Sequence, residues 1–171
     1  MPAPAIRACS PDDADALGLV GAATFLATFA GVLDGAAIVA HCAQAHSPQR
    51  YRALFAEGYE LWLAEAGPGA APVGYAMIGP STLDLSQPGD LELKRIYVLD
   101  RFHGTGVGAA LMRTVLGVAR ERAAARMLVG VYAGNARAQA FYGKCGFQRI
   151  GERRFTVGPA VYEDFVFALA L

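Results

Sequence analysis

Three glycines within five residues form the part of this sequence best suited to bind an anion. Gly104, Gly106 and Gly108 lie between an apolar segment that ends in β-branched residues and a long amphipathic segment. Closely spaced glycines let the backbone approach a ligand. The N-terminus of a following helix presents free N–H groups and the positive end of the helix dipole. The spacing therefore predicts a phosphate-binding loop between a strand and a helix.

The same loop also fits a relaxed Gly-x-Gly-x-x-Ala pattern, which is typical of dinucleotide-binding folds. In those folds the motif follows the first strand, and an acidic residue ends the second strand. Here the loop comes after residue 100, and the next apolar segment, residues 127–132, contains no acid. The Gly-Lys-Ser/Thr ending of a P-loop is also missing from residues 101–109. A nucleotide-binding Rossmann domain is therefore only a distant alternative.

A second motif follows, and together the two resemble the signatures of the GCN5-related N-acetyltransferase (GNAT) superfamily. Arg101-x-x-Gly104-x-Gly106 is similar to the loop that holds the pyrophosphate of acetyl-coenzyme A in that superfamily. Residues 135–147, NARAQAFYGKCGF, resemble its N-x-x-A-x-x-F-Y-x-K-x-G-F motif. Residues 91–98, and residues 155–158 leading to Asp164, are similar to the PaiA-type branch, which includes bacterial spermidine/spermine N-acetyltransferases.

The resemblance implies two catalytic residues. Tyr142 corresponds to the general acid that protonates the departing coenzyme A thiolate, a role that suits a positioned phenol that is neutral at working pH. Glu92 is the candidate base for the incoming ammonium, directly or through water. Alternation along a strand would place Glu92 on the same face as Ile96, where the acetyl group is expected. A carboxylate that merely pairs with Lys94 or Arg95 is an equally supported interpretation.

The resemblance also implies how acetyl-coenzyme A binds. The backbone N–H and C=O groups of Ile96 and Val98 would pair with pantetheine like an added strand, and one N–H would polarise the acetyl carbonyl. Asn135 would contact the pantetheine arm and Lys144 the phosphates, unless Lys144 is simply solvated. His103 departs from the family, where many relatives have Arg or Lys. The residues expected at the coenzyme are Ile96, Tyr97, Val98, Arg101, His103, Gly104, Thr105, Gly106, Val107, Gly108, Ala109, Asn135 and Lys144.

Hydrophobic periodicity and turn residues predict the elements that position these groups. The predicted strands cover residues 5–9, 59–65, 73–78, 91–99, 127–132, 147–157 and 162–169. The predicted helices cover residues 10–32, 35–45, 47–58, 105–125 and 135–145, the first with Ser10 as N-cap and Pro11 at its first position. This order predicts a mixed sheet with helices on both faces. Together with this order, the resemblance implies an α/β (α+β) GNAT fold with a mostly antiparallel sheet of about seven strands. The length predicts a single domain over residues 1–171.

The composition excludes several other classes of protein. With 54% hydrophobic and 18% charged residues the chain is not disordered, and zero net charge gives no reason to expect nucleic-acid binding. Residues 16–33 are uncharged but interrupted by glycine and threonine, so they predict a buried helix and no membrane contact. Three distant cysteines, and residues 1–7 without signal-peptide order, favour the cytoplasm. No histidine or cysteine spacing suggests a metal site.

The charges are divided unevenly along the chain. Residues 1–90 carry 3 basic and 9 acidic side chains, whereas residues 91–171 carry 12 basic and 6 acidic ones. The basic half contains both coenzyme motifs, and the acidic half contains the helices expected to cover the acceptor site. We therefore expect acidic side chains near the acceptor, which would suit a cationic amine. Aromatic residues expected in that region are Phe25, Phe29 and Tyr51, although such residues at helical spacing are more often core.

The sequence thus predicts acetyl transfer from acetyl-coenzyme A to a primary amine, by direct attack in a ternary complex and without a metal. A polyamine is the favoured acceptor, on the branch resemblance alone. The alternative acceptors are another small amine or a protein amine. The alternative function is a non-catalytic regulatory module that binds acyl-coenzyme A. The high apolar content is compatible with a homodimer without requiring one.

Overall fold

The computed structural model describes residues 4–171, so Met1–Ala3, part of the segment considered for a signal peptide, lie outside the described residues. One seven-stranded sheet has the strand order β1-β2-β3-β4-β5-β7-β6. Its strands are β1 (Ala5–Ala8), β2 (Glu60–Ala66), β3 (Ala71–Pro80), β4 (Asp90–Val98), β5 (Arg126–Tyr132), β6 (Gln148–Val157) and β7 (Ala160–Ala170). The helices are α1 (Ala14–Phe29), α2 (Gly35–Ala45), α3 (Pro48–Ala56), α4 (Val107–Glu121) and α5 (Ala136–Lys144).

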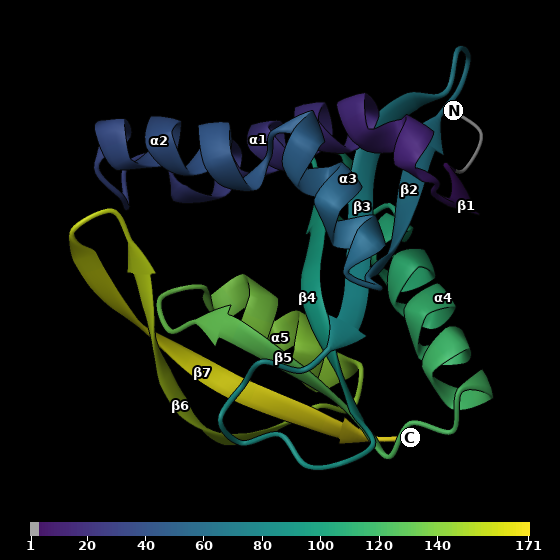
Figure 1. Cartoon of the computed structure of the whole chain (residues 1–171), viewed down its shortest axis with the longest axis vertical. Helices are drawn as coiled ribbons and strands as arrows, with labels where there is room; N and C mark the ends of the chain where they lie inside the picture. The colour runs from purple at the N-terminus through teal and green to yellow at the C-terminus, as the bar shows by residue number, and fades with distance from the viewer. Residues whose placement is uncertain (1–3) are drawn as a thin grey trace.

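The sheet is antiparallel except at β4 and β5, which are parallel and only briefly paired. Their pairing covers the first three residues of each strand and ends at Glu92 opposite Leu128. Beyond that point the two strands diverge, as Figure 1 shows, while β4 stays paired with β3 and β5 with β7. The mixed sheet predicted from the sequence is confirmed, and its two halves open into a V at the centre.

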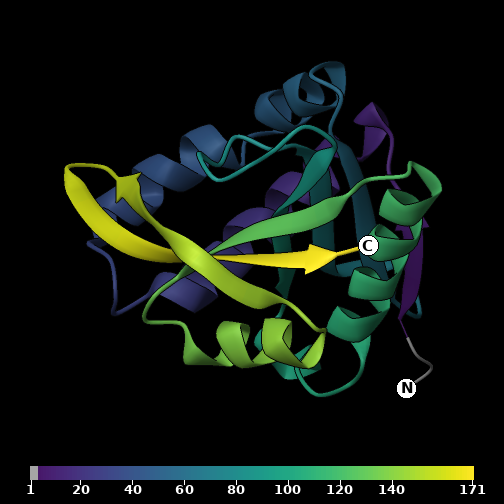
Figure 2. The same ribbon diagram turned by 90° about the horizontal axis from the view of Figure 1, so that it is seen from below.

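Helices cover both faces of this sheet. On one face α4 and α5 enclose the main core, whose members include Leu111, Val115 and Tyr142. On the other face α1 and α3 pack through Leu17 and Leu54 over β2 and β3. Farther along, α1 and α2 lie against the end of the β6–β7 hairpin. Figure 2 shows α5 and α2 on opposite sides of the strands β5, β7 and β6.

Local signals set the helix ends. Ser10 caps a short 3-10 turn that leads into α1, because its backbone N–H donates to the Asp13 carboxylate (2.8 Å) and its hydroxyl accepts from the Asp12 N–H (3.3 Å). α1 ends at Phe29 rather than at the predicted residue 32, since Gly31 takes a positive φ of 79°. Within residues 4–171, no helix has the length and apolar character needed to cross a membrane.

β4 carries one residue more than its partner, and this changes which side chains share a face. Ile78 pairs with Leu93 and Met77 with Arg95, so Lys94 has no partner on β3 and forms a β-bulge. A bulge shifts the alternation of side chains by one residue. Leu93 and Ile96 consequently pack in the same core cluster although they are an odd number of residues apart. The predicted alternation of residues 92, 94 and 96 on one face is therefore wrong.

Candidate active site

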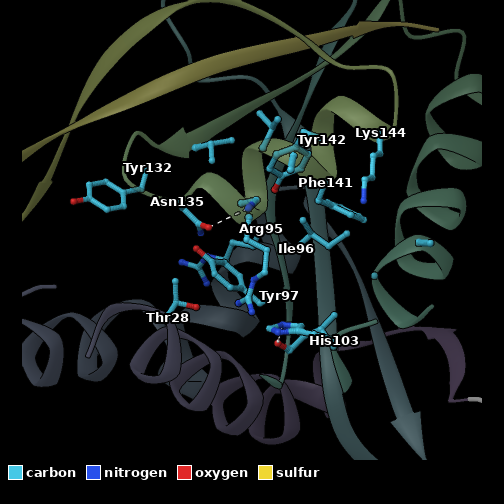
Figure 3. Close-up of a pocket in the computed structure, with 18 of the residues that line it drawn as sticks. Thr28, Arg95, Ile96, Tyr97, His103, Tyr132, Asn135, Phe141, Tyr142 and Lys144 are labelled. Atoms are coloured by element: carbon cyan, nitrogen blue, oxygen red, sulfur yellow. Dashed lines mark hydrogen bonds between the residues drawn. The ribbon is translucent and has the colours of Figure 1, made fainter. Parts of the chain in front are cut away.

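The diverging strands enclose a cavity of about 570 Å³. β4 contributes residues 94–98, β5 contributes residues 129–132, and α1 contributes Thr28 and Phe29. The loop before α4 and the inner face of α5 complete the wall. In Figure 3, Tyr142 and Lys144 project from α5 toward β4, and Thr28 approaches from α1.

The glycine loop has the backbone that the sequence predicts for an anion site. Gly104 and Gly106 have positive φ values of 77° and 90°, and the position of a Cβ on either is open space. The first N–H that bonds within α4 is that of Ala110, which donates to the Gly106 carbonyl (2.9 Å). The N–H groups of the preceding turn therefore have no partner within α4. These N–H groups and the helix dipole can hold a phosphate.

Only part of the loop faces the cavity. Of the residues expected at the coenzyme, Gly104, Gly106, Gly108, Ala109 and His103 line the cavity, whereas Arg101, Thr105 and Val107 do not. The Arg101 guanidinium lies over the Phe102 ring, 5.4 Å from its centroid. The Thr105 hydroxyl donates to the Phe102 carbonyl (2.6 Å), and Val107 is in the core. The side chains of these three residues are therefore not placed to contact a ligand in the cavity.

The inner edge of β4 offers backbone groups to the cavity. The Leu99 N–H donates to the Val73 carbonyl of β3 (2.8 Å), and backbone groups alternate in direction along an antiparallel strand. The N–H and C=O groups of Ile96 and Val98 therefore point away from β3, toward the gap where β5 has diverged. His103 uses one of them, since its Nε2 donates to the Val98 carbonyl (2.8 Å).

α5 brings the predicted acid into the cavity. The Tyr142 ring is buried at 6% exposure, and this burial raises the pKa of its hydroxyl well above the usual range. The phenol is therefore protonated at neutral pH and able to donate. Asn135 lies at the start of α5, where its side-chain oxygen accepts the Ala138 N–H (3.0 Å). Asn135 and the exposed Lys144 both line the cavity.

Glu92 does not lie where the sequence predicts. Its side chain is only 4% exposed and is not part of the cavity wall. One carboxylate oxygen accepts the Thr82 N–H (2.8 Å) and lies 2.7 Å from the Lys94 ammonium. The bulge at Lys94 separates Glu92 from the face that carries Ile96. A direct contact between Glu92 and an amine in the cavity is thus excluded in this geometry.

Of the three aromatic residues expected at the acceptor, one lines the cavity. Phe29 forms part of its wall, next to Thr28. Phe25 instead stacks on His41, with ring centroids 4.3 Å apart. Tyr51 is fully buried, and its hydroxyl lies 3.0 Å from Nδ1 of His46. Phe25 and Tyr51 therefore support the wall from behind.

The charges around the cavity differ from those predicted. Four cationic side chains line it, namely Lys94, Arg95, Arg137 and Lys144, and across residues 4–171 no aspartate or glutamate does. The expectation that the acidic half of the chain supplies the acceptor site is therefore wrong. Arg95 and Tyr132 are wall residues that sequence reasoning missed, although an arginine directly before the apolar segment of residues 96–98 is a signal that could have marked Arg95.

A comparison with known protein families identifies the family of this chain. The acetyltransferase (GNAT) family matches residues 34–147, more than half of the chain. The chain belongs to the GNAT family of acetyltransferases. This GNAT chain is 44% identical over 94 residues to an uncharacterized N-acetyltransferase of Mycobacterium tuberculosis. The matched residues cover 55% of this chain and 57% of that protein. The chain thus spans little more than half the length of the curated relatives it matches.

Solved structures confirm the GNAT fold over nearly the whole chain. The PaiA N-acetyltransferase from Thermoplasma acidophilum in complex with coenzyme A has a TM-score of 0.77, with 17% identity and coverage of 98% of this chain and 99% of that one. The yncA structure from Salmonella typhimurium with its cofactor acetyl-CoA has a TM-score of 0.69, with 20% identity and coverage of 98% and 93%. At these identities the likeness establishes the fold.

Proposed function

We propose that this GNAT chain transfers an acetyl group from acetyl-coenzyme A to the primary amine of a small molecule. The observation that carries the proposal is the single cavity wall that joins the glycine loop, the free edge of β4 and the Tyr142 hydroxyl. Two similar GNAT structures hold coenzyme A or acetyl-CoA, which supports the same ligand here.

The described residues fit such a ligand. The unpaired N–H groups at the start of α4 would hold the pyrophosphate, and Arg137 and Lys144 add positive charge to the same cavity. The backbone of Ile96 and Val98 would pair with the pantetheine arm along the gap between β4 and β5. The Val98 carbonyl oxygen already accepts from His103, so pantetheine would bond to its second lone pair or displace the His103 side chain.

The reaction would proceed by direct attack in a ternary complex. The amine nitrogen attacks the acetyl carbonyl, a C–N bond forms and the C–S bond breaks. The Ile96 N–H would stabilise the developing oxyanion, and Tyr142 would donate its proton to the departing sulfur. Among residues 4–171, no carboxylate lines the cavity to accept the proton of the amine. We therefore propose that water molecules carry this proton toward Glu92. Their path would pass Lys94, which lines the cavity and contacts Glu92.

The acceptor expected from the PaiA-type resemblance is a polyamine, and that resemblance is its support. Because the cavity wall is cationic, the assay of candidate acceptors should also include amines whose net charge differs from that of a polyamine. A cytoplasmic location and a homodimer stay predictions from the sequence.

Thiol release from acetyl-coenzyme A in the presence of a panel of amines tests the proposal. We expect Tyr142→Phe to lower kcat about 100-fold with at least one accepted amine, because the leaving thiolate loses its acid. Tyr162→Phe is the matched control, since Tyr162 is a partly buried tyrosine of β7 outside the cavity wall. If Tyr142→Phe keeps full activity, Tyr142 is not the acid. Coenzyme binding by calorimetry with no thiol release from any amine would instead favour an acyl-coenzyme A-binding module.

A further inference from the structure

Arg95 is a half-buried cation of the cavity wall, and none of the residues that the structure describes supplies an anion to it. Its guanidinium Nη1 donates to the Ala45 carbonyl at the end of α2 (3.2 Å) and to the Tyr51 hydroxyl (3.2 Å). By contrast, two other partly buried arginines, Arg126 and Arg153, pair with the carboxylates of Asp90 and Asp164, at 2.6 Å and 3.1 Å. Among residues 4–171, no carboxylate lies within ion-pair distance of Arg95.

The titratable groups around Arg95 are neutral at neutral pH. Burial raises the pKa of Tyr51, Tyr75 and Tyr97, so these phenols stay protonated. Burial, together with the positive charge of Arg95, lowers the pKa of His46 to about 3 and also lowers that of His41. None of these five groups compensates the guanidinium. A cation withdrawn from water without a partner is unfavourable, and a bound anion would remove that penalty.

The position of Arg95 separates it from the expected phosphate site. Its contacts with Ala45 and Tyr51 lie on the face of the sheet that α1, α2 and α3 cover. Ile96, the next residue, packs in the core on the α4 and α5 face. Val98, beside the glycine loop, is three residues farther along β4, about 10 Å at the usual rise of a strand. The anion at Arg95 is therefore expected on the acceptor.

We propose that Arg95 binds an anionic group of the acceptor, so that the substrate is a small amine that also carries a carboxylate or a phosphate. The inference rests on the acetyl transfer proposed above and names its substrate class. The Nε and Nη2 donors of Arg95 have no hydrogen-bond partner among the described residues, and a guanidinium fork matches either anion in a bidentate pair. Among residues 4–171, no carboxylate that could bind a polyamine is part of the same wall.

Matched pairs of amines test this substrate class. Each pair differs only in the anionic group: phenylalanine with phenethylamine, and O-phosphoethanolamine with ethanolamine. We expect the wild-type protein to use the anionic member of at least one pair with a kcat/KM about tenfold or more above its partner, since hydrogen bonds to charged groups contribute that much. Spermidine, measured in the same assay, should be a poorer substrate than that anionic amine.

Variants assign the preference to Arg95. Arg95→Gln should bring the ratio of kcat/KM within that pair close to 1, and Arg95→Lys, which keeps the charge but loses the fork, should restore part of it. Arg137→Gln, which removes another cation of the cavity wall, should keep the wild-type ratio. A role of Arg95 in folding alone would lower the rates with both members equally and leave the ratio unchanged, and that result would overturn the proposal.

The two proposals fail in different ways. If the wild-type protein releases thiol with no amine, acetyl transfer itself is wrong. If it acetylates amines but prefers spermidine, or prefers in both pairs the member that lacks the anionic group, acetyl transfer stands and the role of Arg95 as an anion-binding residue is refuted.

Discussion

Replacing Gly21 with alanine probes the wall that supports Arg95. Gly21 lies in the middle of α1, and a Cβ at this position would be 2.4 Å from Nδ1 of His46 and 2.4 Å from the Tyr51 hydroxyl oxygen. Those two atoms are joined by a buried hydrogen bond of 3.0 Å. The new methyl group therefore cannot be accommodated unless both side chains move.

The size of the effect follows from three contributions to the free energy of unfolding. Overpacking costs about 1–3 kcal/mol, and leaving a buried hydrogen-bonding group unsatisfied costs about 1–3 kcal/mol. Alanine is about 1 kcal/mol more favourable than glycine inside a helix. We therefore expect Gly21→Ala to destabilise the protein by about 1–5 kcal/mol, which corresponds to a fall in Tm of roughly 2–20 °C for a chain of this size.

Gly117→Ala is the matched control. Gly117 also lies inside a helix, α4, but a Cβ there would meet no atom within 4 Å, so only the helix preference acts. We expect this variant to gain about 0.5–1 kcal/mol. Urea unfolding at pH 7 measures both variants. If Gly21→Ala proves as stable as Gly117→Ala, the packing of His46 and Tyr51 against α1 is not as described.

Two further predictions concern the titratable groups. The pKa of His46 is lowered to about 3 in the folded protein, so the unfolded chain binds more protons below pH 6.5 and stability is lost as the pH falls from 6.5 toward 3. Urea unfolding should show a stability about 1 kcal/mol lower at pH 5.5 than at pH 7. His46→Gln should reduce this difference, and an unchanged difference would contradict the assignment. Glu92→Gln should lower kcat about tenfold with little change in the KM for acetyl-coenzyme A, whereas wild-type kcat at every pH would exclude Glu92 as the end of the proton relay.

Local signals were sufficient to predict most of the fold. The second helix was predicted at residues 35–45 and is found there, because the Asp34 side chain caps it through the Ala37 N–H (3.1 Å). The glycine loop and the Asn135 motif are also local, since each sets the start of one helix. Their positions relative to one another follow from the parallel pairing of β4 and β5.

Long-range contacts account for the part of the site that was not predicted. The bulge at Lys94 depends on how β4 pairs with Met77 and Ile78 of β3, which no pattern within β4 reveals. The Arg95 contacts with Ala45 and Tyr51 join residues 50 and 44 positions apart. The acidic residues of the first half are engaged elsewhere, for example Asp13 with Arg7 and Glu57 with Arg50. The net charge of a segment of the sequence therefore does not predict the charge of the cavity wall.

The β-bulge at Lys94 has a consequence for how this protein can change. Because Arg95 and Ile96 are neighbours on β4 but face opposite sides of the sheet, this one strand contributes a residue to each of the two proposed binding sites in the cavity. Deleting one residue at the bulge would restore regular pairing of β4 with β3. The side chains of β4 on one side of the bulge, either before it or after it, would then point to the opposite face of the sheet. Substitutions at position 95 can therefore alter acceptor preference gradually, whereas insertions or deletions in β4 would exchange the two faces at once. Natural variation in this strand is expected to consist of substitutions at constant length.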